Sequence, residues 1–361
     1  MQDCYRSGLR WLAYSGIQAE SGGVSRYYAA DLDQYQDIST AITAYSIQAY
    51  LYLPLPGQTG LLSNALRAGQ FLCYDAGNER AGLFPFEMPR HGLPTHALGY
   101  FFDCGIVIRA LLALWNTTAD PLYLERAESC GGALLDRMSR VDGSFFPVLD
   151  LASGAPSQPS SERWSLEPGV YQLKVGMAFL ELAEVTSSGL FSKVAEHLLQ
   201  WALRRHELFL PGHSEPDRVA DRLTAYCYFL EGLLPFIDKR FECAQALQAG
   251  ITRVENLQAE TAPVLERSDV AAQLLRLRLL ADYIGVIELD LSRAEREAEA
   301  LPAFQLRTGD RRTDGGFGFG RRRGQLAPHA NPLSTIVCLQ ALRMWNEYKR
   351  GELRTTWQEL I

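Results

Sequence analysis

The stretch ALGYFFDCGIVIRALLALW, residues 97–115, decides the fold that we predict for this chain. Only Asp103 and Arg109 are charged in it, so apolar side chains surround nearly the whole circumference of a helix. A helix of that kind is buried on all sides. Residues 119–138 follow with charges spread among leucines and alanines, which is the pattern of an amphipathic helix with one solvated face. Together the two segments predict a hairpin of one inner and one outer helix.

This hairpin recurs along the chain. Three ungapped segments, 43–50, 104–111 and 335–342, share a small first residue, a long polar sixth residue and an alanine at the seventh position. Weaker relatives begin near Glu167, Asp217 and Ser268, so six inner helices are expected. Five of them precede a more charged helix, predicted at 61–74, 122–138, 191–206, 241–257 and 291–301.

The sixth outer helix is expected at the opposite end of the chain. Residues 3–17 form a helix without an inner partner before it, and the last inner helix, 332–348, has no outer helix after it. Pairing them would close a ring. The sequence therefore predicts an all-α (α/α)6 toroid of six hairpins, with residues 1–361 as a single domain. An open α-solenoid is the rival interpretation.

Loop length predicts where the functional end lies. Connections within hairpins are short, whereas those leading into the next inner helix are long and rich in Gly, Pro and aromatic residues. The long connections should therefore share one end, which we call the rim, and binding residues concentrate on loops that a rigid scaffold holds. The rim loops are residues 21–28, 81–96, 142–167, 211–217, 260–269 and 314–331.

Composition limits the partners. The net charge is −7 and the pI is near 5.5, which disfavours nucleic acid as a partner. The start has no pattern of a secretory signal, and no run reaches the roughly 18 to 20 apolar residues of a membrane span. Seven scattered cysteines are typical of reduced thiols, so we expect a cytoplasmic protein with no membrane contact. The usual zinc and phosphate-loop motifs are missing, so neither a metal nor another cofactor is predicted.

The rim residues predict a saccharide ligand. Aromatic faces stack on sugar rings, while carboxylates and arginines bind hydroxyl and carboxyl groups. The Arg321 to Arg323 run is either a solvated charge cluster or an anion clamp, and its position after a glycine-rich segment on the rim supports the clamp. The candidate substrate-binding residues are Arg26, Tyr28, Tyr171, Arg222, Phe317, Arg321, Arg322 and His329.

Four residues are the candidate catalytic centre. Asp103 lies in the first turn of the most apolar helix, where it can interact with the helix N-terminus, form an ion pair or serve catalysis or binding. Glu87 lies in the apolar loop segment FPFEMP, where a raised pKa would suit a general acid. Asp103 would then be the base or nucleophile. His91 and Tyr100 are the candidates for proton transfer in an epimerase or a lyase.

The chain resembles a known group of proteins. The residues are Gly22-Gly-Val-Ser-Arg-Tyr27, Phe102-Asp-Cys-Gly105, Asp142-Gly143, and Asn331-Pro-Leu-Ser-Thr335 with Gln340-Ala-Leu342. They resemble the six-hairpin toroid proteins of bacterial exopolysaccharide gene clusters, which are similar to six-hairpin glycosidases, the uronyl C5-epimerase C-terminal domain and prenyltransferase or squalene-cyclase repeats. In that group Asp-Thr-Gly is expected where this chain has Asp103-Cys-Gly.

Three functions are compatible with these observations. The first is an enzyme, a hydrolase, lyase or epimerase, that acts on a bacterial oligosaccharide or polysaccharide that can contain uronate. The second is a non-catalytic saccharide-binding or scaffold protein of polysaccharide biosynthesis. The third is a terpenoid or prenyl cyclase-like protein, which is disfavoured because the sequence shows no acid cluster for it.

Overall fold

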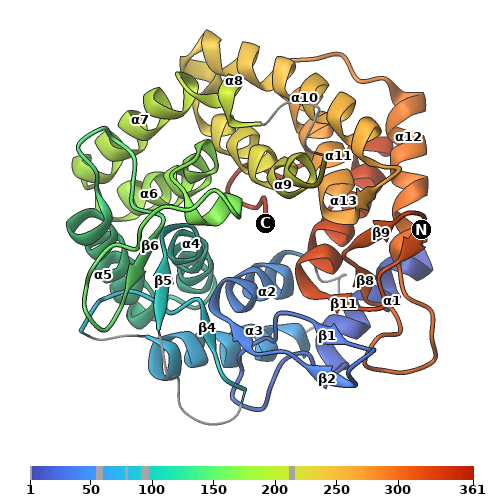
Figure 1. The fold of residues 1–361 in the computed structure, drawn as a ribbon, viewed down its shortest axis with the longest axis horizontal. Helices are drawn as coiled ribbons and strands as arrows, with labels where there is room; N and C mark the ends of the chain where they lie inside the picture. The colour runs from blue at the N-terminus through green and yellow to red at the C-terminus, as the bar shows by residue number, and fades with distance from the viewer. Residues whose placement is uncertain (1, 54–59, 78–79, 91–96, 211–215) are drawn as a thin grey trace. The chain divides into compact units, whose positions relative to one another are not determined.

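The computed structural model describes residues 2–53, 60–77, 80–90, 97–210 and 216–361 (Figure 1). Two compact units make up the chain. The terminal unit comprises Met1–Ile17, Tyr27–Tyr35 and Glu207–Ile361, and the middle unit comprises Gln18–Arg26 and Gln36–His206.

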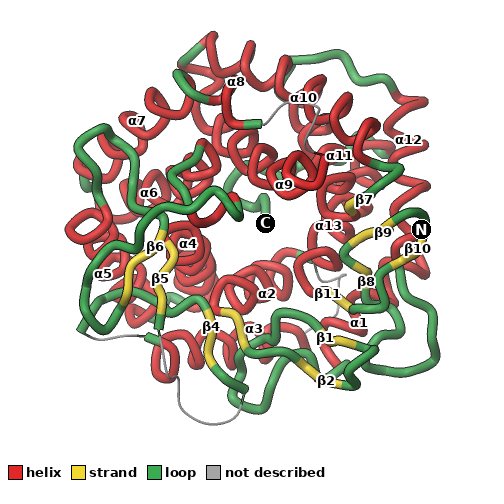
Figure 2. Tube along the Cα trace, viewed as in Figure 1, coloured by secondary structure: helices red, strands yellow, loops and turns green. Residues whose placement is uncertain are grey.

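The middle unit contains three helical hairpins, and its inner helix α4 packs between the inner helices α2 and α6 (Figure 1). Two pairs of short strands, β3 with β4 and β5 with β6, lie next to the hairpins (Figure 2). The helices are α2 (Thr40–Tyr52), α3 (Gly60–Gln70), α4 (Phe101–Thr118), α5 (Pro121–Met138), α6 (Leu173–Thr186) and α7 (Gly189–Leu203), with η1 (Phe71–Ala76), η2 (Trp164–Leu166) and η3 (Val170–Gln172). The strands are β3 (Ile38–Ser39), β4 (Glu87–Met88), β5 (Leu98–Tyr100) and β6 (Val148–Asp150).

The terminal unit also contains three hairpins, in which α11 packs between α9 and α13. Its strands form two small antiparallel sheets, ordered β2-β1-β11-β8 and β10-β9-β7. The helices are α1 (Gln2–Tyr14), α9 (Pro216–Leu233), α10 (Phe241–Thr261), α11 (Ser268–Tyr283), α12 (Leu291–Ala300) and α13 (Pro332–Lys349), with η4 (Leu234–Lys239) and η5 (Leu301–Phe304), and α8 (His206–Phe209) precedes them. The strands are β1 (Tyr28–Ala29), β2 (Gln34–Tyr35), β7 (Leu265–Arg267), β8 (Phe317–Gly318), β9 (Gly320–Arg322), β10 (Gln325–Leu326) and β11 (Ala330–Asn331).

The predicted pairing of the two chain ends is confirmed. Helix α1 packs against α13, and Gly8 permits the close approach, because a Cβ atom there would lie 2.8 Å from Leu339. The indole nitrogen of Trp11 donates to the Arg312 carbonyl at 2.8 Å. Among the described residues, the four-residue α8 is the one α-helix beyond the twelve that the sequence predicted. A single domain over the whole chain stays a prediction.

Two inner helices start later than predicted. Residues 98–100 pair with β6 as a strand, so α4 begins at Phe101 rather than at Ala97. Helix α6 begins at Leu173, because the preceding segment forms the short 3-10 turns η2 and η3. By length and composition alone α4 could cross a membrane, but 78% of it is buried inside the fold, as expected of a core helix.

The rim loops are fastened to the inner helices by a repeated hydrogen bond. The fourth residue of three inner helices accepts a backbone N–H from the loop before it. The glycine two residues before each donor has a positive φ. A Cβ atom would lie 2.2 Å from the Arg67 carbonyl at Gly22 and 2.6 Å from the Ser7 carbonyl at Gly315, so only glycine fits. The bonds are Val24 N to Thr43 Oγ1, 2.8 Å; Phe84 N to Cys104 Sγ, 3.5 Å; and Phe317 N to Thr335 Oγ1, 2.9 Å.

A polar side chain lies at the ninth residue of five inner helices, and four of these groups, Arg109, Glu181, Arg276 and Gln340, link neighbouring helices within each unit. The Arg109 guanidinium forms an ion pair with Glu181 at 2.9 Å, which joins α4 to α6. Arg276 is fully buried and pairs with the fully buried Glu231 at 2.7 Å, which joins α11 to α9. The five residues are Gln48, Arg109, Glu181, Arg276 and Gln340.

We expect Leu342→Ala to lower the free energy of unfolding by about 2 to 5 kcal/mol, because the side chain is fully buried in α13 and its removal leaves a cavity. Urea unfolding of both proteins measures the difference. Leu62→Ala is the matched control, since Leu62 lies on α3 and is 40% exposed. A loss below about 0.5 kcal/mol at Leu342 would mean that α13 is not an inner helix.

We expect Glu231→Gln to cost about 3 to 5 kcal/mol, because it removes the buried carboxylate that pairs with the Arg276 guanidinium. The exposed pair Arg350 and Glu352 provides the control, and Glu352→Gln should cost less than about 1 kcal/mol. Chemical denaturation of the two variants decides the comparison. Equal losses would show that burial does not govern the strength of the inner pair.

Candidate functional site

Asp103 occupies the first turn of α4 without the partners that a buried carboxyl normally has. The side chain is 8% exposed, and its Oδ2 atom accepts no hydrogen bond from the described residues. Tyr100 is the N-cap residue of α4 and makes no side-chain cap, and the N–H of Phe101 donates to the Pro147 carbonyl instead. Among the described residues, Asp103 therefore forms neither a capping hydrogen bond nor an ion pair.

Its surroundings favour the protonated acid. The pKa of Asp103 is raised to about 7, chiefly by burial and also by the nearby Glu87 carboxylate, and the Arg26 guanidinium partly opposes both effects. A carboxyl group with a pKa near 7 can hold a proton at neutral pH and can donate it.

Glu87 has a different environment from the one that its apolar sequence context suggested. It lies in β4, opposite Ser39 of β3, and its Oε1 atom forms an ion pair with the Arg26 guanidinium. That guanidinium also lies 5.6 Å from the centre of the Phe86 ring. The N–H of Arg26 donates to the Asp37 carbonyl at 2.9 Å, which positions the arginine. The two carboxyl groups therefore differ, because Glu87 has the Arg26 guanidinium as a partner and Asp103 forms no ion pair with the described residues.

Aromatic residues surround the two carboxyl groups. The Tyr100 ring lies 4.8 Å from the Phe86 ring, and burial raises the pKa of Tyr100, with Asp103 adding to the effect. Burial raises the pKa of Tyr171 as well, and its hydroxyl donates to the Glu167 carbonyl at 2.9 Å. Both tyrosines are therefore protonated near neutral pH and can act as hydrogen-bond donors.

Two residues of this neighbourhood were not singled out from the sequence. Trp164 packs edge-on against Phe102 and Tyr171, at ring-centre distances of 5.4 Å and 4.7 Å. The charge of Arg163, the preceding residue, acts on Tyr100. The signal that could have found them is an adjacent arginine and tryptophan within a rim loop of mostly small and polar residues, SGAPSQPSSERWSLEPG.

The structure thus brings Asp103, Glu87 and Tyr100 together in the middle unit, along with Arg26 and Tyr171. His91, the fourth catalytic candidate, lies outside the described residues. No group of three or more His, Cys, Asp or Glu residues in the described ranges is arranged to hold a metal ion.

The other candidate binding residues belong to the terminal unit, and two of them are core residues. Tyr28 is 1% exposed, its hydroxyl donates to Asp33 at 2.5 Å, and the Arg312 guanidinium lies over its ring. Phe317 is fully buried and donates its N–H to Thr335. Tyr28 and Phe317 therefore pack in the core of the unit, and a part for either residue in substrate binding stays a prediction.

The remaining candidates also have partners within the protein. Arg222 donates to the Phe209 carbonyl at 3.1 Å, and Arg321 donates to the Ala303 carbonyl at 2.9 Å. Arg322 pairs with Gln325 across β9 and β10. His329 lies 3.4 Å from the Asp31 carboxylate and packs against Tyr27. An anion clamp at Arg321 and Arg322 stays a prediction, and Glu266, 3.6 Å from Arg321, already offsets part of its charge.

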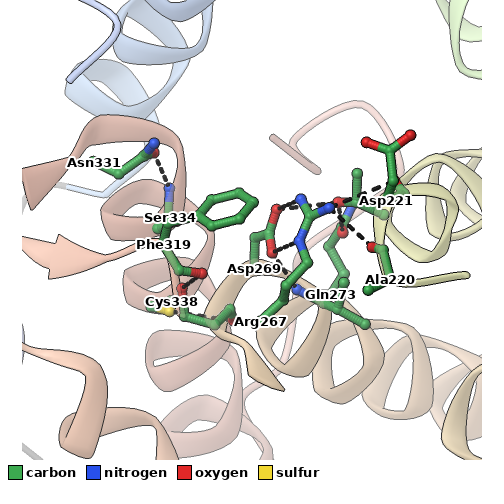
Figure 3. A network of polar contacts seen from close by, with 12 residues as sticks. Ala220, Asp221, Arg267, Asp269, Gln273, Phe319, Asn331, Ser334 and Cys338 are labelled. Carbon is green, nitrogen blue, oxygen red and sulfur yellow. Dashed lines mark hydrogen bonds and ion pairs between the residues drawn. The ribbon is translucent and has the colours of Figure 1, made fainter. Parts of the chain in front are cut away.

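Figure 3 shows the terminal unit's counterpart to Asp103, a first-turn aspartate with a full set of partners. Asp269 is 2% exposed and accepts from the Arg267 guanidinium through both oxygens. Its Oδ1 atom also accepts the Val270 N–H at 2.9 Å, and its Oδ2 atom accepts from the Thr224 hydroxyl at 3.3 Å. Asp269 therefore stabilises the start of α11, a role that Asp103 does not fill at α4.

No known family matches the chain, and no curated protein matches it. Solved structures do match. A sugar epimerase from a ruminal bacterium superposes with a TM-score of 0.70 at 13% identity, covering 94% of this chain and 98% of the other. Cellobiose 2-epimerase from Bacillus thermoamylovorans gives 0.72 at 12% identity, with 95% and 100% covered. An unsaturated glucuronyl hydrolase from a Bacillus species, responsible for the degradation of glycosaminoglycan, gives 0.63 at 14% identity, with 99% of each chain covered.

The similarity to these solved structures, at 12 to 14% sequence identity, establishes the fold. The matched proteins process carbohydrates, and they are six-hairpin, glycosidase-like toroids. The chain therefore has the all-α (α/α)6 toroid fold that these carbohydrate enzymes share.

Proposed function

We propose that this protein is a glycan-processing enzyme that acts on a bacterial oligosaccharide or polysaccharide. The observation that carries the proposal is Asp103, a buried carboxyl group without a hydrogen-bond partner for its Oδ2 atom among the described residues. Burying such a group costs free energy, and perturbed carboxyl groups gather at functional sites. The fold shared with carbohydrate-processing enzymes supports the same conclusion.

The two carboxyl groups have different environments, and we assign them different catalytic roles for that reason. Asp103, with its pKa near 7, donates a proton to a sugar oxygen or accepts one from a sugar carbon. Glu87, held as a carboxylate by Arg26, supplies the negative charge that stabilises a developing cation or activates a nucleophile. When Asp103 is the proton donor, the roles that the sequence suggested for the two residues are reversed. The charges of Asp103 and Glu87 both raise the pKa of Tyr100, so its hydroxyl group keeps its proton and can donate a hydrogen bond.

The aromatic residues fit a saccharide ligand, because sugar rings present apolar C–H faces that pack on aromatic side chains. Hydrolysis, elimination and epimerisation all need a proton donor and an acceptor across one sugar ring, and this pair of carboxyl groups suits each. All seven cysteines are free and buried, which agrees with a cytoplasmic location as part of the proposal.

We expect Asp103→Asn to reduce turnover by at least about 100-fold, the usual contribution of a positioned general acid. Proton NMR of the sugar detects hydrolysis, elimination and epimerisation in one experiment, with neutral and uronate-containing oligosaccharides as substrates. Glu87→Gln should also lose turnover. Asp120→Asn is the control, because Asp120 is an exposed N-cap residue of α5.

Retention of turnover by a folded Asp103→Asn protein would remove Asp103 from the mechanism. A wild-type protein that binds saccharides and turns none of them over would favour the alternative function, a non-catalytic saccharide-binding or scaffold protein.

We expect the stability of the wild type to fall as the pH rises from 5 to 8. The Asp103 carboxyl loses its proton near pH 7 in the folded protein and near pH 4 in the unfolded chain, so the folded state binds the extra proton between these values. The loss relative to Asp103→Asn is about 3 kcal/mol, since each unit between pH 5 and 7 contributes about 1.4 kcal/mol. Urea unfolding of both proteins at pH 5 and pH 8 measures it. An equal change in the free energy of unfolding of the two proteins between pH 5 and pH 8 would show that Asp103 has an ordinary pKa.

A further inference from the structure

We propose that Arg163 and Trp164 form a binding site for an acidic sugar beside Asp103, with the sugar ring on the Trp164 side chain and its carboxylate on the Arg163 guanidinium. The inference rests on the proposed function and names the substrate class for that site. Neither residue was among the candidates from the sequence.

Trp164 is held in place by its neighbours while the residue remains partly exposed. Its plane is nearly perpendicular to the Phe102 ring, at 86°, and to the Tyr171 ring, at 76°. The turn that carries it is closed by backbone hydrogen bonds from Leu166 N to the Arg163 carbonyl, 3.1 Å, and from Ser160 N to the Leu166 carbonyl, 3.0 Å. Trp164 itself is only half-buried. A partly exposed aromatic side chain that its neighbours hold in place suits the apolar face of a sugar.

Trp164 packs directly against Phe102 and Tyr171, which are neighbours of Asp103. Phe102 immediately precedes Asp103 on α4, and the Asp103 charge acts on Tyr171. A sugar ring on Trp164 would therefore lie beside Phe102 and Tyr171, the two residues that connect Trp164 to Asp103.

Arg163 is the cation at this site that has no counter-charge. Its side chain is exposed and forms no ion pair with any residue that the structure describes, its sequence neighbour Glu162 included. Arg26, by contrast, is neutralised by Glu87.

The difference between the two arginines favours an anionic ligand. Arg26 is already paired with Glu87, whereas Arg163 forms no ion pair with the described residues, so its guanidinium can bind the carboxylate of a ligand. A guanidinium binds a carboxylate through two parallel hydrogen bonds, which a neutral sugar cannot reproduce. The chemistry therefore selects a uronate ring over a neutral hexose.

The experiment compares binding of methyl glucuronide and methyl glucoside by isothermal titration calorimetry at low salt. We expect the wild type to bind the glucuronide roughly ten- to hundredfold more tightly, the difference expected of hydrogen bonds to a charged group. Arg163→Gln should remove that preference and leave the affinity for the glucoside unchanged. Trp164→Ala should weaken both ligands, and Trp164→Phe, which keeps an aromatic ring, should restore most of the binding.

Matched controls test the specificity of these effects. Arg10→Gln removes an exposed arginine of α1, and Trp357→Phe alters a half-buried tryptophan near the C-terminus, so neither should change the ratio of the two affinities. Equal affinity of the wild type for the two sugars would overturn the inference, and so would a preference that survives Arg163→Gln. Because binding needs no turnover, either result leaves the proposed function to be judged separately by the Asp103→Asn assay.

Discussion

A charge on a fully buried helix needs a partner, and this constraint organises the inner helices of both units. Transfer of an ion from water to the protein interior costs several kcal/mol unless a counter-charge and hydrogen bonds compensate. Arg109 accordingly pairs with Glu181, Arg276 pairs with Glu231, and Asp269 binds Arg267 through both oxygens. The first two pairs each join two neighbouring inner helices, and the third stabilises the start of α11.

Asp103 is an exception to this constraint, because it is buried on an inner helix and forms no ion pair with the described residues. A stability-driven fold would pair this carboxyl, as it pairs Asp269, or would place an apolar residue there. The protein instead keeps it buried beside a second carboxylate, where protonation is the cheapest way to avoid an isolated charge. The glycine-anchored rim loops place Arg26 and Glu87 next to it, so the same loop geometry that repeats for structural reasons assembles a chemically distinct site once.

Much of the helical architecture was predictable from the sequence, because helix periodicity and the polar sixth residue shared by segments 43–50, 104–111 and 335–342 are local signals. The pairing of α1 with α13 followed from counting unpartnered helices. The site was harder to predict. Asp103 stood out as a charge in an apolar helix, but the partner of Glu87 is 61 residues away at Arg26, and no local pattern encodes that contact. The roles of the two carboxyls therefore followed only from the tertiary environment, as did the proximity of Trp164 to Phe102.

The pKa of Asp103 tests this account most directly. Carbon-13 NMR titration of the aspartate carboxyl groups, with the resonance assigned by its absence in Asp103→Asn, measures it in the folded protein. The account predicts a midpoint near pH 7, about three units above the ordinary value of 3.8. A midpoint near 4 would contradict it, because Asp103 would then be a solvated carboxylate and neither the burial penalty nor the acid role assigned to it would hold.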